Sequence, residues 1–147
     1  EPEGAGSIMH LPHPAILPYL PGPLLRSLHR DLCSLRGQRW GTPNPASSFI
    51  RYHPWTTLLT YHAQVLQEFK ARGFRFAKGW SSPYYRGRTT APWTQDDIVP
   101  TLLTAAYPEH TPEYYRQSLL RATQRLQRGK WLPEDHLRLS QAPRAIP

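Results

Sequence analysis

The sequence predicts a mostly α-helical protein: a single compact helical domain with an extended, proline-rich N-terminal arm. Three stretches place apolar residues at the spacing of three and four that gives a helix one buried face, and no strand-rich segment competes with them. The chain has 147 residues, of which 39% are hydrophobic, with five tryptophans and eight tyrosines. This length and composition are typical of one globular domain rather than of a disordered chain.

The sequence divides into three parts. Residues 1–8 are mostly small and polar, and we interpret them as a remnant of an expression vector before a natural start at Met9. Residues 9–131 form the expected helical domain, and residues 132–147 a poorly structured C-terminal tail. Prolines at positions 12, 14, 18 and 21 remove amide donors from the start of the domain. We therefore expect this arm to be extended and to be held against the core by its apolar residues.

The first predicted helix runs from Pro23 to Gly37. Proline suits the first turn of a helix, and glycine suits the left-handed position just after the last turn. One face carries the apolar residues Leu24, Leu25, Leu28, Leu32 and Leu35. Asp31 lies at the border between this face and a basic face that contains Arg30. A carboxylate at this border is partly desolvated, and it could face a ligand that lies along the basic face.

The second predicted helix begins at Thr56 or Thr57 and ends at Arg72, with Gly73 as its stop. Its buried face carries Leu58, Leu59, Val65, Leu66 and Phe69. His62 projects onto the same face, which favours a hydrogen-bonded core histidine. Glu68 lies off this face and is expected to be a solvated acid. The segment Phe49–Tyr52 before the helix is expected to be short and extended.

Two further helix starts follow. Thr94 is a candidate cap for a helix that Pro100 bends or splits before about Tyr107. Thr111 is a candidate cap for a helix that ends at Arg128, with Gly129 as its stop. In that last helix we expect Leu119, Leu120, Ala122 and Leu126 to pack inward. The expected exposed basic side holds Arg116, Arg121, Arg125 and Arg128.

The charge points to a polyanionic partner. The formal net charge is +8, and arginine outnumbers lysine. Such an excess favours nucleic acid, although a coding bias toward arginine combined with ordinary solubility would also produce it. Residues 74–90 are aromatic, basic and punctuated by glycine. This composition suits bases stacked on aromatic rings and phosphates held by arginine, but it equally suits a loop that Trp80 and Tyr84 pack onto the core.

Several classes of site are not indicated. No apolar run approaches the roughly 18 residues of a membrane span, and no signal peptide is evident. Cys33 is the only cysteine, which excludes an internal disulfide and leaves too few thiols for a structural zinc site. Phosphate-binding glycine loops, His-Glu-x-x-His and Gly-x-Ser-x-Gly are absent. We therefore expect no metal, no cofactor and no membrane partner, and a cytoplasmic protein, nucleoid-associated in a bacterium.

The sequence resembles a known family. Its bacterial branch has a Met-x-Leu start, then Leu-Ile-Pro-x-Leu-Pro, then His-Arg-Glu-x-Cys-x-Leu-Arg-Gly-x-x-Trp-Gly. The matching segments here are 9–11 (MHL), 16–21 (ILPYLP), 29–41 (HRDLCSLRGQRWG), 61–62, 68–74, 83–87 (PYYRG) and 107–110 (YPEH). The chain is thus similar to the pyrimidine-dimer DNA glycosylases of the phage endonuclease V type, and segment 29–41 is the most specific part of the match.

The resemblance implies a helical DNA-repair enzyme, expected to act as a monomer on double-stranded DNA that carries damaged pyrimidines. In the phage type the nucleophile is the α-amine of the chain, assisted by a glutamate on the first helix. Residue by residue, the amine falls on Met9, the carboxylate on Asp31 and the preceding DNA-contacting arginine on Arg30. The expected DNA contacts are Arg26, Arg30, Arg36, Arg39, Trp40, Tyr84, Tyr85, Arg86 and Arg88.

Two other functions remain open from the sequence. The first is a helical module that binds bent or damaged DNA without cutting it. The second is a metal-independent nuclease in which His29 and Asp31 act as acid and base. Independently of this alternative, His29 and His62 are possible site residues. The resemblance favours a glycosylase with an associated abasic-site lyase activity over both alternatives.

Overall fold

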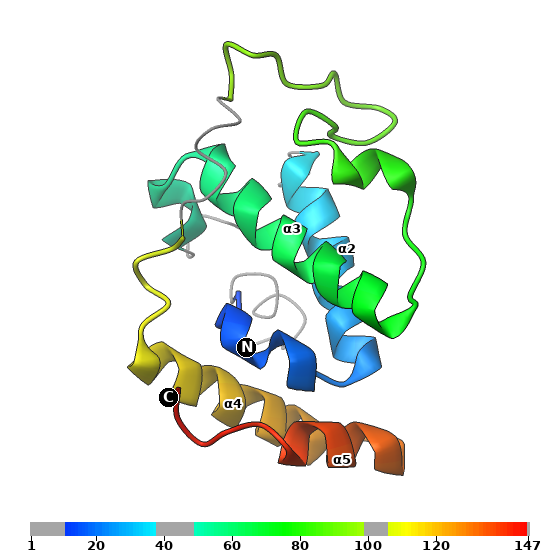
Figure 1. Ribbon diagram of the computed structural model, residues 1–147, viewed down its shortest axis with the longest axis vertical. Helices are drawn as coiled ribbons and strands as arrows, with labels where there is room; N and C mark the ends of the chain where they lie inside the picture. Colours follow the sequence, from blue (N-terminus) through cyan, green and yellow to red (C-terminus); the bar gives the residue numbers. More distant parts are fainter. Residues whose placement is uncertain (1–10, 38–48, 99–105, 147) are drawn as a thin grey trace. The chain divides into compact units, whose positions relative to one another are not determined.

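The computed structural model describes residues 11–37, 49–98 and 106–146 of the chain, and the regular elements among these residues are all helices (Figure 1). The α-helices are α2 (Gly22–Arg36), α3 (Trp55–Arg72), α4 (Pro112–Leu126) and α5 (Pro133–Ser140). Short 3-10 helices are η1 (Pro14–Tyr19), η3 (Phe49–Tyr52) and η4 (Lys78–Ser81). The predicted helical class is confirmed. No helix in the described ranges is long and apolar enough to cross a membrane.

The helix boundaries follow from local sequence. In α2, Pro23 lies in the first turn, and Leu25, Leu28, Leu32 and Leu35 are buried as predicted. Helix α3 ends at Gly73, whose φ of 73° is the left-handed conformation that glycine adopts without strain. Its amide bonds back to the carbonyl of Lys70. The predicted bounds of these two helices are therefore correct to within about two residues.

The described chain forms two compact units. The first, here the α3 unit, contains Leu11 and the described residues of Leu28–Tyr107. Its core includes the apolar face of α3, and His62 of that face is fully buried. Beside it, Leu59, Trp93 and Ile98 form a cluster against which Trp55 and Tyr84 pack. The segment that follows η4 is thus joined to α3 through aromatic side chains.

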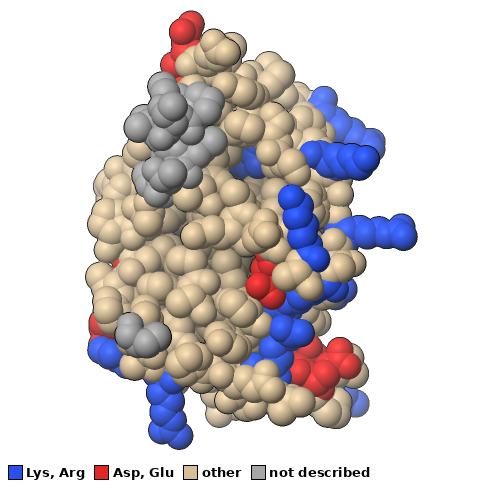
Figure 2. Space-filling model, viewed as in Figure 1, with Lys and Arg blue, Asp and Glu red and all other residues tan. Residues whose placement is uncertain are grey.

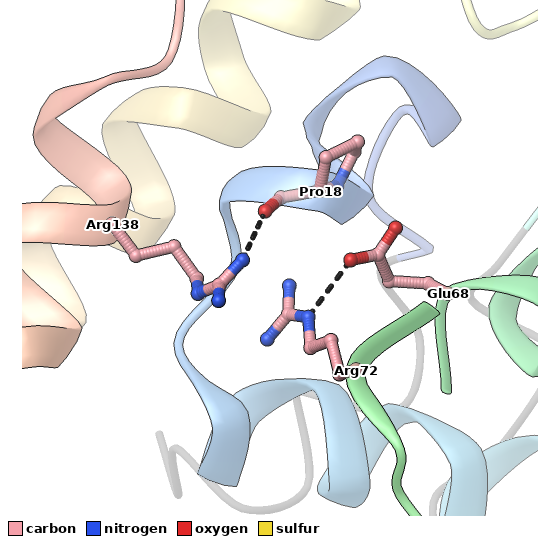
Figure 3. A network of polar contacts seen from close by, with 4 residues as sticks. All are labelled: Pro18, Glu68, Arg72 and Arg138. Carbon is pink, nitrogen blue, oxygen red and sulfur yellow. Dashed lines mark hydrogen bonds and ion pairs between the residues drawn. The ribbon is translucent and has the colours of Figure 1, made fainter. Parts of the chain in front are cut away.

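The second unit, here the α4–α5 unit, contains the described residues of Pro12–Ser27 and Pro108–Pro147. Elements η1, α4 and α5 pack against one another within it. The His13 amide donates to Ser118 Oγ at 3.0 Å, and Arg138 Nη1 of α5 donates to the carbonyl of Pro18 at 2.8 Å (Figure 3). Tyr115 of α4 donates to the carbonyl of Pro143 at 2.6 Å. The first two bonds join the N-terminal segment to α4 and α5, and the third joins α4 to the segment after α5.

Several expectations for the terminal segments are wrong. Within the described part of the arm, Pro14–Tyr19 form the 3-10 helix η1 rather than an extended segment, because the hydrogen bonds of this helix use the amides of Ile16 and Leu20 and require none from the prolines. Its apolar residues are buried, as expected. The expected loose tail contains helix α5, whose start is stabilised by the Asp135 carboxylate accepting from the Leu132 amide at 3.2 Å.

Four smaller expectations also differ. Phe49–Tyr52 is a 3-10 helix. The residues after Thr94 form a turn, in which Asp97 accepts from the Thr94 amide at 2.8 Å, and the rest of that expected helix lies outside the described residues. Leu120 is 56% exposed rather than packed inward. Glu68 is paired with Arg72 at 2.8 Å instead of solvated (Figure 3), because the i,i+4 spacing brings the two side chains together.

Candidate active site

Asp31 is a half-buried carboxylate on α2. Burial raises its pKa from 3.8 to about 6, and the neighbouring positive charge of Arg30 opposes this rise. Among the residues that the structure describes, none forms a hydrogen bond or ion pair with this carboxylate. Its oxygens are therefore available to a ligand, and the group can exchange a proton close to neutral pH.

Three of the predicted DNA-contacting arginines are exposed, and one of them, Arg30, is the neighbour of Asp31. Arg26 and Arg30 are both exposed and lie four residues apart on α2, so they project from neighbouring turns of one helix. Arg88 is also exposed. Lysine and arginine side chains extend from the surface in the view of Figure 2. The predicted phosphate contacts at these three positions remain compatible with their exposure.

Arg36 has a different role from the predicted one. Its side chain is 2% exposed, and its guanidinium donates to the carbonyls of Trp80 at 3.1 Å, Ser82 at 2.6 Å and Tyr85 at 2.6 Å. It also stacks on the Trp80 ring at 5.0 Å from the ring centroid. A guanidinium that is buried and whose Nη1 and Nη2 atoms are bonded inside the protein is not available to a phosphate, so Arg36 is removed from the set of DNA contacts.

The segment that Arg36 holds is itself tied back to α2. Arg86 Nε donates to the Arg36 carbonyl at 2.8 Å, and its guanidinium lies over Trp93 at 4.4 Å. Tyr85 packs edge-on against Trp80 at 4.8 Å. Residues 80–86 are therefore a loop packed onto the core, which was one of the two alternatives that the sequence left open. Tyr84, Tyr85 and Arg86 are half-buried in this loop. Their partly exposed atoms leave a nucleic-acid contact open as a proposal.

His29 and His62 form a hydrogen-bonded chain with Arg36. Arg36 Nη1 lies 3.2 Å from His62 Nδ1, and His62 Nε2 lies 2.9 Å from His29 Nδ1. Because a guanidinium only donates, His62 Nδ1 accepts, and the proton on Nε2 is donated to His29. Burial lowers the pKa of His29 to about 4, with Arg30 and Arg36 adding to the effect, and burial also lowers that of His62 well below 6.5. Both rings are therefore neutral at physiological pH.

This geometry gives no support to an acid–base pair of His29 and Asp31. Residues two apart on a helix project about 200° apart around its axis. His29 is directed toward α3, where it contacts Phe69 at 4.9 Å between ring centroids, and its nitrogen is bonded to His62. The nuclease alternative therefore has no support from the arrangement of these two side chains.

A family comparison decides the identity. The family model described as pyrimidine dimer DNA glycosylase matches residues 8–82. The chain belongs to this family. The matched region contains α2, α3 and η4, and with them Arg30 and Asp31. Membership supports a DNA glycosylase, hence a protein that acts on DNA. No curated protein and no solved structure matches the chain.

Within this glycosylase, three predicted site residues cannot be placed. Met9, Arg39 and Trp40 lie outside the described residues. Their predicted roles as amine nucleophile and DNA contacts stay predictions.

Sequence reasoning missed the grouping of Cys33 with the two histidines. The Cys33 Sγ lies 3.6 Å from His29 Nε2, one helical turn away on α2. The i,i+4 spacing of His29 and Cys33 was a usable signal, and so was the position of His62 on the buried face of α3. The sequence could not show that His62 joins His29 and Cys33, because it does not specify which turns of α2 and α3 face each other.

Proposed function

We propose that this glycosylase excises ultraviolet-induced pyrimidine dimers from double-stranded DNA and then cleaves the abasic site as a lyase. The observation that carries the proposal is Asp31: a half-buried carboxylate without a hydrogen-bond partner in the described ranges, within the family match and beside the exposed Arg30. A carboxylate in this setting can stabilise a positively charged sugar and move a proton.

The reaction that we propose uses the α-amine of Met9. An α-amine has a pKa of about 7.7–8, so roughly a tenth of it is free base at neutral pH. The amine attacks C1′ of the damaged nucleotide, and the C1′–base bond breaks as the base leaves with its electron pair and takes up a proton. The nitrogen then loses one proton, and the C1′–O4′ bond breaks as O4′ takes up a proton, which gives a protonated Schiff base. Removal of the C2′ proton then expels the 3′ phosphate and cuts the strand.

Asp31 supports two of these steps in its ionised form. Its negative charge stabilises the oxocarbenium-like charge that develops as the base leaves, and its oxygens relay protons during Schiff-base formation. Because the pKa of Asp31 is about 6, the ionised fraction falls as pH drops below that value. We expect the rate of base excision to fall with it.

The proposed DNA contacts are graded by exposure. Arg26 and Arg30 on α2 and the exposed Arg88 hold phosphates, which positions the duplex without reading its sequence. The half-buried Tyr84, Tyr85 and Arg86 are secondary contacts, together with Arg39 and Trp40. Recognition exploits the weakened stacking of the lesion, with a nucleotide turned out of the duplex.

Borohydride trapping tests the proposal. The substrate is a duplex with one cyclobutane thymine dimer, and two proteins are compared: one that begins at Met9 and one that retains residues 1–8. A covalent adduct formed only with the free Met9 terminus supports the terminal-amine mechanism. An adduct with both proteins moves the nucleophile to a lysine. Tight lesion binding with no adduct from either protein refutes the lyase proposal and favours the binding module.

Asp31→Asn is the matching variant. It keeps the size of the side chain but cannot carry the negative charge, so base excision is expected to fall at least about 100-fold, the lower range for an acid–base group. Ser34→Ala, on the same helix, is the control and should leave excision unchanged. Full activity in Asp31→Asn would remove Asp31 from the mechanism.

A further inference from the structure

A second group of reactive side chains lies in the α3 unit, and the glycosylase chemistry does not use it. We call it the His–Cys cluster: His29 and Cys33 from α2, one turn apart, and His62 from α3. One ligand atom from each residue lies within 4.8 Å of the other two. Two imidazoles and a thiol in this arrangement form a donor set that zinc and similar transition ions prefer over magnesium or calcium.

Two of the three ligand–ligand distances are close to those of a tetrahedral zinc site. Zinc lies about 2.0–2.1 Å from nitrogen and about 2.3 Å from sulfur, which places two ligand nitrogens about 3.3 Å apart and nitrogen and sulfur about 3.6 Å apart. His29 Nδ1 lies 2.9 Å from His62 Nε2 and 3.8 Å from Cys33 Sγ. The third pair, Cys33 Sγ and His62 Nε2, lies within 4.8 Å, so coordination by all three atoms needs side-chain rotations that close this pair by up to about 1.2 Å.

The surroundings restrict the access of water to the cluster. His62 is fully buried, and Cys33 is half-buried. The rings of Phe69, Phe76 and Trp80 lie around His29 at centroid distances of 4.9, 6.2 and 6.5 Å. An apolar shell of this kind strengthens the bonds of an enclosed ion to its ligands because it lowers the local dielectric.

We propose, against the expectation of no metal from the sequence, that His29 Nδ1, Cys33 Sγ and His62 Nε2 form a site with three protein ligands for one zinc-type transition ion. Binding forms two metal–nitrogen bonds and one metal–sulfur bond and releases the thiol proton of Cys33 to solvent. The proton on His62 Nε2 moves to Nδ1, since Nε2 then holds the metal. Arg36 Nη1 consequently gives up its bond to His62 and keeps its bond to the Trp80 carbonyl. The thiolate offsets part of the charge that the ion adds near Arg36.

The site is separate from the proposed chemistry at Asp31. Asp31 lies midway between His29 and Cys33 in sequence, so its side chain projects from the opposite side of α2. The ion would therefore link α2 to α3, and it would not touch the reacting sugar. Failure of the zinc site and failure of the glycosylase mechanism are thus separate results.

Cobalt and zinc titrations test the site. Protein freed of metal with a chelator is titrated with Co²⁺, and the thiolate-to-cobalt charge-transfer band and the strong visible bands of tetrahedral cobalt are recorded. We expect one Co²⁺ per chain, displaced by one Zn²⁺. Zn²⁺ should raise the melting temperature of the wild type. In Cys33→Ser the charge-transfer band should disappear and the Zn²⁺ affinity should fall at least about tenfold, the lower range for losing a residue that merely supports a ligand.

Matched variants distinguish binding at the His–Cys cluster from binding at surface histidines. His136→Gln alters an exposed histidine of α5 and should bind Co²⁺ and Zn²⁺ like the wild type. His29→Gln provides a second ligand variant if Cys33→Ser fails to fold, as judged by far-UV circular dichroism. The proposal is overturned if the wild type binds no stoichiometric metal, or if both ligand variants, correctly folded, retain wild-type affinity. Schiff-base trapping without added metal reports on the glycosylase independently.

Discussion

Replacing Arg36 with methionine should separate its structural role from any role in DNA binding. Methionine retains an unbranched apolar side chain against Trp80 and removes the guanidinium. The substitution leaves four acceptors without their donor: the carbonyls of Trp80, Ser82 and Tyr85 and the Nδ1 atom of His62. Burial lowers the pKa of Arg36 only to about 10, so the lost group is a cation at neutral pH.

The magnitude follows from which acceptors water can reach. Ser82 is exposed, and Tyr85 is half-buried, so water replaces part of the bonding there. His62 is fully buried, and the Trp80 bond is partly buried. A buried acceptor left without a partner costs about 1–3 kcal/mol, and His62 Nδ1 and the Trp80 carbonyl are two such acceptors. We expect Arg36→Met to lower the free energy of unfolding by about 2–4 kcal/mol.

Equilibrium unfolding in urea, followed by far-UV circular dichroism, measures this loss. Arg30→Met on the same helix is the control, because Arg30 is exposed and its replacement should change stability by no more than about 0.5 kcal/mol. Arg36→Lys should fall between the wild type and Arg36→Met, since one ammonium group cannot reach all three carbonyls. A loss below about 1 kcal/mol in Arg36→Met would refute the reasoning.

Two further predictions concern stability. Because folding raises the pKa of Asp31 from 3.8 to about 6, the folded protein binds this proton more tightly and loses stability as pH rises through that window. Asp31→Asn should therefore melt above the wild type at pH 7, and the gain should vanish below pH 3.8; equal melting temperatures at pH 7 would contradict this. Gly73→Ala should lower the free energy of unfolding, measured in urea, by about 1 kcal/mol. The φ of Gly73 is 73°, and a Cβ added there meets no atom within 4 Å, so the loss comes from backbone strain alone. Gly73→Asn should cost less, and no loss in Gly73→Ala would refute the left-handed cap.

Local signals predicted the main helices because each signal acts over one or two turns. Pro23 in the first turn of α2, Gly73 in the left-handed position after α3 and leucines on one face of each helix are signals of this kind. The short helix α5 was not predicted because its local signals are weak. Its eight residues provide too few turns for a clear apolar face, and its start depends on Asp135 bonding to Leu132.

The role of Arg36 could not be predicted in this way. The carbonyls that receive its hydrogen bonds lie 44, 46 and 49 residues further along the chain. From the sequence alone, an arginine near the end of a basic helix favours a phosphate contact. Arg36 is buried because the segment after η4 folds back over the end of α2, and the sequence does not specify this fold.

The sequence by itself determined the helical class, the bounds of α2 and α3, the position of Asp31 between an apolar and a basic face, and the family resemblance. These depend on residues that are neighbours along one helix. Only the tertiary structure decided that Arg36 is internal, that Glu68 is paired within a partly buried surface, and that His29, Cys33 and His62 meet. The physical reason is that burial and hydrogen-bond partners depend on which elements pack together, and this packing is set by contacts between residues far apart in the chain.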